Sequence, residues 1–215
     1  MAKLITPSIL DSYDWYINCP PNFKTAAFQQ ISDSLNRKPW DPTPAILRGM
    51  AFEKMVCQNL DDISRIDFLT KFEGHSPNVG KFWDKCRGGR QQAKVAKTIN
   101  VDGVDYYLYG KRDIAFSDKT IDIKTTGDFK GPKSYLTKNQ HALYIACTDI
   151  EPFEYLIAEY DDVKGICAEV YEVDATMDRE LAMTKVVAKI QEFIAFLTTD
   201  EELLKAYNTT FCRSW

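Results

Sequence analysis

The segment at residues 110–126, GKRDIAFSDKTIDIKTT, constrains the fold of this chain more than any other part of the sequence. Two runs of β-forming residues flank the tetrapeptide at 117–120, which is turn sequence, so the segment predicts an antiparallel hairpin. We expect Phe116 to lie opposite Ile121, which places Asp113 opposite Lys124. A three-residue loop would instead turn Asp113 away from Asp122 and Lys124.

The expected hairpin has one apolar face and one polar face, because side chains alternate along a strand. The apolar face, which we assign to the core, carries Ile114, Phe116, Ile121 and Ile123. The polar face carries Asp113, Ala115, Asp122 and Lys124. The small side chain of Ala115 leaves room beside two carboxylates and an ammonium group, an arrangement that suits metal-assisted hydrolysis.

Asp122 lies between β-branched residues in a strand that we expect to be central. Burying an unpaired carboxylate costs several kcal/mol, so Asp122 and Asp113 require a cation or strong hydrogen bonds. A divalent ion is the simplest partner, and oxygen ligands without nearby Cys or His favour Mg²⁺ or Mn²⁺ over zinc. The alternative is an exposed sheet face on which Lys124 simply pairs with Asp113.

A helix expected at about residues 45–60 supplies a candidate third ligand, Glu53. An apolar stripe at helical spacing surrounds it, consisting of Ile46, Met50, Cys57 and Leu60. An acid on the core-facing side of a helix is well placed to reach the metal. The alternative is that this stripe is mis-phased and Glu53 is a surface residue.

Gln140 and Tyr144 share one face of a helix expected at residues 135–147, since they are four positions apart. They support the site, or they are a polar helix edge and a core tyrosine. The segment at 81–97 is basic, with Lys81, Lys85, Arg87, Arg90, Lys94 and Lys97 against Asp84. It predicts either a solvated, mobile connector or an arm that contacts phosphates.

The remaining pattern predicts an α/β fold with helices packed on a mixed sheet of about four to five strands. Helices are expected at 9–17, 23–35 and within 178–207. Strands are expected at 97–101, 104–109, 153–159 and 166–173, with a type I′ turn at Asp102-Gly103. We expect one domain over residues 1–215, with a helical part to about 60, a sheet core at about 97–173 and C-terminal helices at about 178–207.

Composition excludes several classes of protein. The formal charge of −4 rules out a uniformly basic surface but leaves room for a local basic groove. The six cysteines form no CxxC pair, which argues against a disulfide framework and against zinc-ligand spacing. No apolar run is long enough to span a membrane, and no signal-peptide core or Walker loop is present, so an intracellular protein without ATPase activity is expected.

Five motifs in order resemble the PD-(D/E)XK nuclease superfamily, in particular its RecB-like and phage-exonuclease branch. The resemblance covers about residues 6–160. It consists of Thr6-Pro-Ser8 with Tyr16, Cys19-Pro20 and Phe23; Arg48-Gly49 through Glu53; Gly110-Lys-Arg-Asp113; Ile121-Asp-Ile-Lys124; and Gln140 through Tyr144. Arg112 stands where the superfamily name has proline. The clustered late cysteines of iron–sulfur relatives are missing, so we predict no such cluster.

The resemblance implies a restriction-endonuclease-like core and hydrolysis of DNA phosphodiester bonds by an exonuclease in recombination, repair or phage DNA processing. Mg²⁺ or Mn²⁺ would be held by Glu53, Asp113, Asp122 and the carbonyl of Ile123, with Lys124 as the catalytic cation. Gly49, Gln140, Tyr144, Arg87 and Arg90 would support the site or contact DNA.

By the same resemblance, the protein would act in the cytoplasm of a bacterium or a phage-infected host. It would work alone or with a separate recombination or single-strand-binding protein. Two alternatives remain: a catalytically inactive DNA-binding module of nuclease fold, and an unrelated α/β protein with a structural hairpin.

Overall fold

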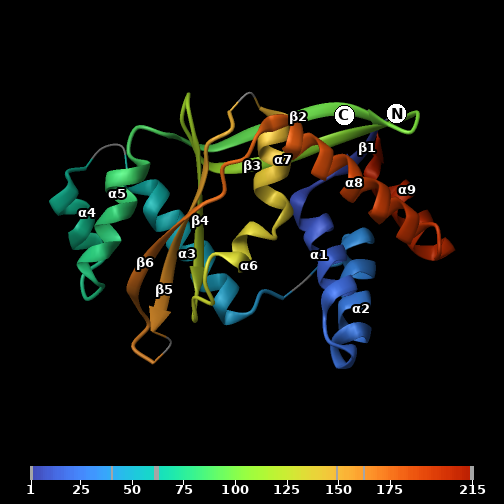
Figure 1. Ribbon diagram of the computed structural model, residues 1–215. Helices are drawn as coiled ribbons and strands as arrows, with labels where there is room; N and C mark the ends of the chain where they lie inside the picture. The colour runs from blue at the N-terminus through green and yellow to red at the C-terminus, as the bar shows by residue number, and fades with distance from the viewer. Residues whose placement is uncertain (1, 40, 61–62, 149, 162, 214–215) are drawn as a thin grey trace.

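A computed structural model of the chain describes residues 2–39, 41–60, 63–148, 150–161 and 163–213. Within these ranges one mixed sheet has the order β6-β5-β4-β3-β1-β7, and β2 pairs with β3 outside this path. The pairs β1/β3 and β4/β5 are parallel, and the other pairs are antiparallel. Helices flank the sheet (Figure 1). The predicted mixed α/β fold class is therefore confirmed.

Two of the strands are too short to carry a sequence pattern. The strands are β1 (Ala2–Ile5), β2 (Arg90–Val101), β3 (Val104–Ala115), β4 (Thr120–Thr126), β5 (Phe153–Asp161), β6 (Ile166–Asp174) and β7 (Cys212–Arg213). The expected sheet of four to five strands corresponds to β2–β6. Sequence alternation did not reveal β1 and β7, since alternation over two to four residues is uninformative.

The helices include all the predicted ones, with that expected at 135–147 divided in two, and also two short helices within 63–97 that were not predicted. They are α1 (Pro7–Asn18), α2 (Lys24–Leu35), α3 (Pro44–Gln58), α4 (Arg65–Lys71), α5 (Gly80–Cys86), α6 (Lys133–Leu136), α7 (Asn139–Cys147), α8 (Arg179–Leu197) and α9 (Glu201–Phe211). Thr6 caps α1 by accepting from the amide of Ile9, as its type and position predict. No helix of the described residues is long and apolar enough to cross a membrane.

Two hydrophobic clusters cover opposite faces of β5. The first gathers α1, α2, α7, α8 and α9, and the second gathers α3, α4 and α5. Figure 1 shows α4 and α5 on one side of the upright strands β4–β6, and α1, α2, α7, α8 and α9 on the other. Along β4, Ile121 and Ile123 enter the second cluster, as expected for the apolar face of the hairpin. The alternate residues Asp122 and Lys124 therefore face the side of α7.

The predicted register of the β3–β4 hairpin is wrong by two residues. Ile114 pairs with Ile121, and the amide of Phe116 donates to the carbonyl of Lys119. The turn is centred one residue earlier than expected, so this register, continued beyond the paired residues, aligns Asp113 with Asp122 rather than with Lys124. A shift of two positions preserves which side chains share a face, because the alternation has period 2.

Two strands, β1 and β4, pair with the edge of β3 that faces away from β2, and a stretch without strand pairing separates them. Near one end β1 pairs with residues 106–108, and near the other end β4 pairs only with Ile114 and Ala115. Within the described residues, the stretch 109–113 therefore has no strand partner on that edge. Figure 1 shows β4 turning steeply away from β3 at this point. The two diverging strands form a fork that holds the candidate site.

The predicted apolar stripe of α3 is wrong in its first half. Ile46 and Met50 are 40% and 57% exposed, whereas Phe52 and Val56 are buried. The helix contacts β4 at Gly49, where an added Cβ would lie 2.7 Å from Oγ1 of Thr125. The sheet-facing stripe thus runs through positions 49, 52, 53 and 56, which places Glu53 on its border.

The basic segment at 81–97 is not a mobile connector, because α5 and the start of β2 occupy it. Lys85 pairs with Glu154 and Glu172, Lys81 donates to the carbonyl of Val170, and Lys97 donates to that of Ala146. The side chains of Arg87, Arg90 and Lys94 remain exposed. The segment is therefore structural in part, with a smaller basic surface than the sequence suggested.

Candidate active site

Asp113 and Asp122 lie at the opening of the fork between β3 and β4. Asp122 is fully buried and Asp113 is 9% exposed. The backbone amide of Ile123 donates to Oδ2 of Asp113 at 2.8 Å, so a β3 side chain takes the place of a ladder hydrogen bond on β4. This contact fixes the Asp113 carboxylate between the two strands.

Gln140 and Lys124 hold the carboxylate of Asp122. Nε2 of Gln140 donates to Oδ1 at 2.5 Å, and Nζ of Lys124 forms an ion pair with Oδ2. Despite that ion pair, buried Oδ2 accepts no hydrogen bond of good geometry. A buried carboxylate oxygen of this kind has remaining capacity to bind a cation.

Tyr144 connects α7 to β3 at the edge of the site. Its hydroxyl donates to the carbonyl of Lys111 at 2.8 Å and accepts from the amide of Lys111 at 3.2 Å. Nε2 of Gln140 lies 3.3 Å from the same hydroxyl. The ring packs against Gly110, where an added Cβ would lie 2.1 Å from a ring carbon. Gly110 therefore allows the close approach that brings α7, and Gln140 with it, to Asp122.

Glu53 reaches the fork from α3 through a residue that the sequence analysis missed, Gln92 on β2. Nε2 of Gln92 donates to Oε1 of Glu53 at 2.6 Å and to Oδ1 of Asp113 at 3.3 Å. Gln92 has a φ of 50°, although it belongs to a strand. Nothing in the sequence around Gln92 marks it, since this backbone conformation is unusual for glutamine.

The three carboxylates repel one another, and the pKa values of Glu53 and Asp113 reflect this. Burial, and then the charge of Asp122, raise the pKa of Glu53. Burial, followed by the charges of Asp122 and Glu53, raises the pKa of Asp113 well above its usual 3.8. Burial alone would lower the pKa of Lys124, but the charges of Asp122 and Asp113 outweigh it and raise that pKa. The site thus carries an excess of negative charge that a divalent cation would neutralise.

The structure brings together most of the residues that the sequence singled out, but not all of them. Glu53, Asp113, Asp122 and Lys124 converge, with Gln140 and Tyr144 beside them. Gly49 lies where α3 contacts β4, next to Thr125. Arg87 instead stacks its guanidinium 4.7 Å from the ring of Trp83, and Arg90 pairs across the ladder with Ala115. Ala115 lies two residues from Asp113 on β3, so Arg90 is near Asp113 along the ladder.

Two clefts open beside the carboxylates. One, of about 470 Å³, is lined by Glu53, Gln92 and neighbouring residues of α3 and β2. The other, of about 300 Å³, is lined by Ser8, Lys111, Gln140 and Tyr144 among others. Residues that contact Asp113 or Asp122 thus line both clefts, Gln92 in the first and Gln140 in the second.

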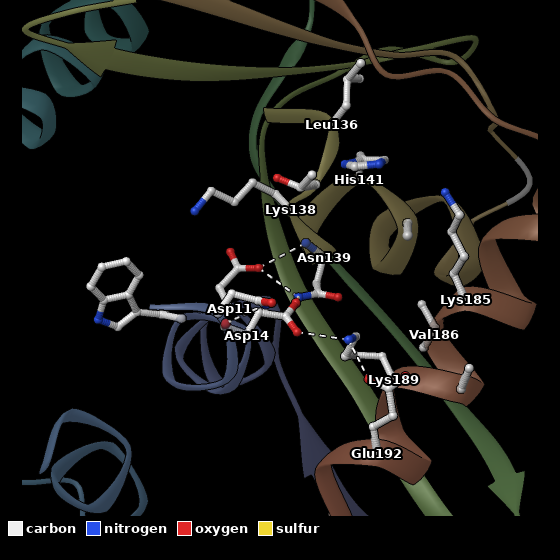
Figure 2. Close-up of a pocket in the computed structure, with 15 residues that line it drawn as sticks. Asp11, Asp14, Leu136, Lys138, Asn139, His141, Lys185, Val186, Lys189 and Glu192 are labelled. Carbon is white, nitrogen blue, oxygen red and sulfur yellow. Dashed lines mark hydrogen bonds and ion pairs between the residues drawn. The ribbon is translucent and has the colours of Figure 1, made fainter. Parts of the chain in front are cut away.

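A larger cavity of about 690 Å³ lies beside the second cleft, between α1, α7 and α8 (Figure 2). Asn139 donates to Asp11 and Asp14 there, and Lys189 donates to Asp14. Figure 2 shows these side chains pointing toward one another across the cavity. They bind three helices together and so fix α7, which carries Gln140. Asp11 also lines the second cleft, so the two hollows adjoin.

The donor set suits a hard divalent cation, although the present geometry is not that of a closed metal site. Carboxylate and carbonyl oxygens are the ligands that Mg²⁺ and Mn²⁺ prefer. Among the described residues, however, no three His, Cys, Asp or Glu side chains surround a common point as metal ligands would. The acceptor oxygen of Asp122 fits a cation, and Gln92 stands between the other two acids.

Comparison with known proteins supports the fold and goes no further. No protein-family model and no curated protein matches the sequence. The alkaline exonuclease LHK-Exo from Laribacter hongkongensis has a similar structure, with a TM-score of 0.51 and 13% identity over 94% of this chain and 91% of that one. LHK-Exo in complex with dAMP gives a TM-score of 0.50 and 14% identity over the same shares. The chain therefore has a fold similar to that of an alkaline exonuclease.

Proposed function

We propose that this protein is a nuclease of the PD-(D/E)XK superfamily that hydrolyses DNA phosphodiester bonds with Mg²⁺ or Mn²⁺ and acts from DNA ends. The observation that carries the proposal is the fork between β3 and β4, where Asp113, Asp122 and Lys124 meet. The acidic motif, the D-x-K strand and the later Gln140/Tyr144 helix are thus neighbours in space as well as in order. The likeness of the fold to an alkaline exonuclease supports the same proposal.

The metal-binding residues in this proposal are Glu53, Asp113, Asp122 and the backbone carbonyl of Ile123. When bound, the cation lowers the pKa of a coordinated water and neutralises charge on the scissile phosphate. These residues fit such an ion, because their oxygens are hard ligands and one buried oxygen of Asp122 lacks a well-formed hydrogen bond.

Lys124 is the catalytic cation in this proposal. Its ammonium group contacts Asp122 at the mouth of the fork, and one third of the side chain is exposed, so it can also reach a substrate. It would orient the attacking water or stabilise charge that develops on the phosphorane. Gln140 keeps the Asp122 carboxylate in place, and Tyr144 anchors Gln140 to the backbone of β3.

DNA is the substrate and partner in the proposal, and the two clefts are its path past the fork. LHK-Exo has been crystallised with the deoxynucleotide dAMP, which supports DNA over RNA. Exposed Arg90 and Lys94 of β2 would contact the phosphate backbone near the site, and Arg87 would do so farther away. The same proposal treats residues 1–215 as one nuclease domain that works alone or with a separate recombination or single-strand-binding protein.

The test is cleavage of end-labelled linear DNA and of covalently closed circular DNA by the full chain, with Mg²⁺, Mn²⁺ or EDTA. We expect metal-dependent release of nucleotides from linear DNA only. Cleavage of the circle would overturn the exonuclease assignment. Binding of DNA without any degradation would instead support the inactive module.

Substitutions of residues in the fork test whether the fork is the site of cleavage. Asp122→Asn and Lys124→Ala should each lower cleavage by at least about a thousandfold, since metal and charge stabilisation supply several kcal/mol of the barrier reduction. Asp128→Ala and Lys164→Ala, at exposed ion pairs, serve as matched controls and should retain activity. Near-normal cleavage by either fork variant would refute the assignment.

A further inference from the structure

Gln92 has a backbone conformation that its local sequence does not explain. The non-glycine residues with positive φ in the described chain are Arg37, Gln92 and Asp102. Arg37 follows the C-cap of α2, where a left-handed residue commonly ends a helix, and Asp102 occupies the turn between β2 and β3. Gln92 lies inside a strand, with Gln91 and Ala93 paired to β3 on either side of it.

The left-handed conformation of Gln92 interrupts the β2–β3 ladder beside the fork. Asp113 is the residue opposite, and it too is missing from the regular pairing between Arg112 and Ile114. In a regular strand, positions 110 and 114 would face the same side of the sheet. Here Gly110 faces α7, whereas Ile114 packs in the cluster of α3 and α5, so the two faces of β3 exchange sides between these positions. Such local breaks in a ladder re-aim side chains, as β-bulges do next to active sites.

The re-aimed side chain of Gln92 connects two acids that come from different elements. Its amide nitrogen lies 2.6 Å from Oε1 of Glu53 on α3 and 3.3 Å from Oδ1 of Asp113 on β3. Because like charges repel, two carboxylates brought together at this spot require a donor between them. The amide supplies one without adding a charge of its own.

We propose that Gln92 is a positioning residue of the metal site, holding Glu53 against Asp113 so that both acids are in place before the cation binds. This inference rests on the proposed function, because it assumes that these acids are metal ligands. A residue keeps a strained backbone conformation only where the surrounding structure holds it there. Such residues cluster at functional sites, where the strain helps to hold side chains in position before a ligand binds. Residues that orient metal ligands typically change metal affinity by about 10- to 100-fold when they are removed.

One substitution at Gln92 separates the role of its backbone, which affects stability, from the role of its side chain, which affects Mn²⁺ affinity. Gln92→Gly removes the amide but places at this site the residue that adopts positive φ most readily. We therefore expect the metal-free variant to be no less stable than the wild type, while its Mn²⁺ affinity falls by about 10- to 100-fold. Gln92→Asn also tolerates positive φ, yet its shorter side chain cannot span both acids, so it should lose affinity as well.

The experiment is titration of the full chain with Mn²⁺ in the absence of DNA, followed by calorimetry and by the electron paramagnetic resonance signal of free Mn²⁺. Melting temperatures in EDTA report stability for the same samples. Asp102→Gly is the matched control, because it relieves the same backbone conformation (φ of 52°) at the far end of the hairpin. It should leave Mn²⁺ affinity unchanged.

Cleavage kinetics add a second readout. If Gln92 positions the ligands, the Mn²⁺ concentration for half-maximal cleavage should rise in Gln92→Gly, and kcat at saturating Mn²⁺ should fall much less. Unchanged Mn²⁺ affinity with a lower melting temperature would show a structural role and overturn the inference. Tighter binding would also overturn it, since the amide would then compete with the metal. A wild-type protein that neither binds Mn²⁺ nor cleaves DNA would refute the proposed function itself.

Discussion

The two ends of the β2–β3 hairpin contain the same unusual backbone conformation for different reasons. At the tip, Asp102 and Gly103 have φ values of 52° and 81° and form the turn between the strands. At the base, Gln92 has a φ of 50° within a paired strand. The tip residues are the types that such turns favour, whereas glutamine is not.

The backbone of the tip is satisfied by its own neighbours, and the side chain of Asp102 accepts from Nε2 of Gln191 on α8. Oδ1 of Asn100 accepts from the amide of Gly103 at 3.1 Å, and its Nδ2 donates to Asp105 at 2.8 Å. At the base, the partners of Gln92 come from α3 and from the opposite strand, and they are acids rather than turn residues. The left-handed backbone at the tip therefore forms the turn between β2 and β3. The left-handed backbone at the base instead directs the side chain of Gln92 toward two acids of the candidate site.

The largest effect is expected at the base, where Asp113→Asn should separate activity from stability. The variant keeps an oxygen that can accept from the amide of Ile123, but it loses a metal ligand. Cleavage should fall by at least about a thousandfold, because charge stabilisation by the metal is lost. In EDTA at neutral pH the variant should be more stable than the wild type by at least about 1 kcal/mol, because a buried charge beside Asp122 and Glu53 is gone.

The stability difference should depend on pH in a defined direction. The pKa of Asp113 in the folded protein lies well above its usual 3.8, first because of burial and then because of its acidic neighbours. The folded wild type therefore holds a proton that the unfolded chain releases, so its stability falls as pH rises from about 3.8 through the raised pKa. Asp113→Asn should lose that dependence when unfolding is followed in EDTA. Equal pH profiles for the two proteins would contradict the raised pKa of Asp113.

A smaller effect is expected midway along the hairpin, at Gly110. In Gly110→Ala the new methyl group would lie 2.1 Å from the ring of Tyr144, so the ring or the strand has to move. We expect a loss of about 1–3 kcal/mol in the free energy of unfolding, as is typical of overpacking. Cleavage should fall by about ten- to a hundredfold, because Gln140 shifts with α7.

A double variant tests whether Gly110→Ala acts through the ring of Tyr144. If Gly110→Ala acts through Tyr144, its cost should largely disappear when Tyr144→Ala has already removed the ring. Chemical denaturation of both single variants and of the pair measures this coupling. Additive losses would place the effect of Gly110→Ala in the strand itself.

The hairpin also shows how much of this molecule can be predicted from sequence. The turn at Asp102-Gly103 follows from residue type, and the acidic and apolar faces of β4 follow from alternation. That alternation survives a register error of two residues, which is why the convergence of Asp113 and Asp122 could be expected although the pairing was wrong. The i, i+4 spacing of Gln140 and Tyr144 likewise placed them on one face.

The parts that could not be predicted depend on contacts between elements. Which face of α3 meets the sheet depends on the approach of Gly49 to Thr125, and a local apolar count gives the wrong phase. The conformation of Gln92 depends on α3 and β3 together, so neither its type nor its neighbours reveal it. Sequence therefore indicated the acids of the candidate site and not the amide that connects two of them.

The smallest effect is expected at the tip, where Gly103→Ala tests the other half of the comparison. An added Cβ at Gly103 would meet nothing within 4 Å, so the only cost is that of placing alanine at a φ of 81°. We expect the free energy of unfolding to fall by about 1–2 kcal/mol, the usual cost of left-handed backbone for a residue with a Cβ. Mn²⁺ affinity and cleavage should not change, because the tip lies at the opposite end of the β2–β3 ladder from Gln92 and Asp113. A loss of Mn²⁺ affinity in this variant would show that the two ends of the hairpin are coupled, and strain at the base could then no longer be attributed to the site alone.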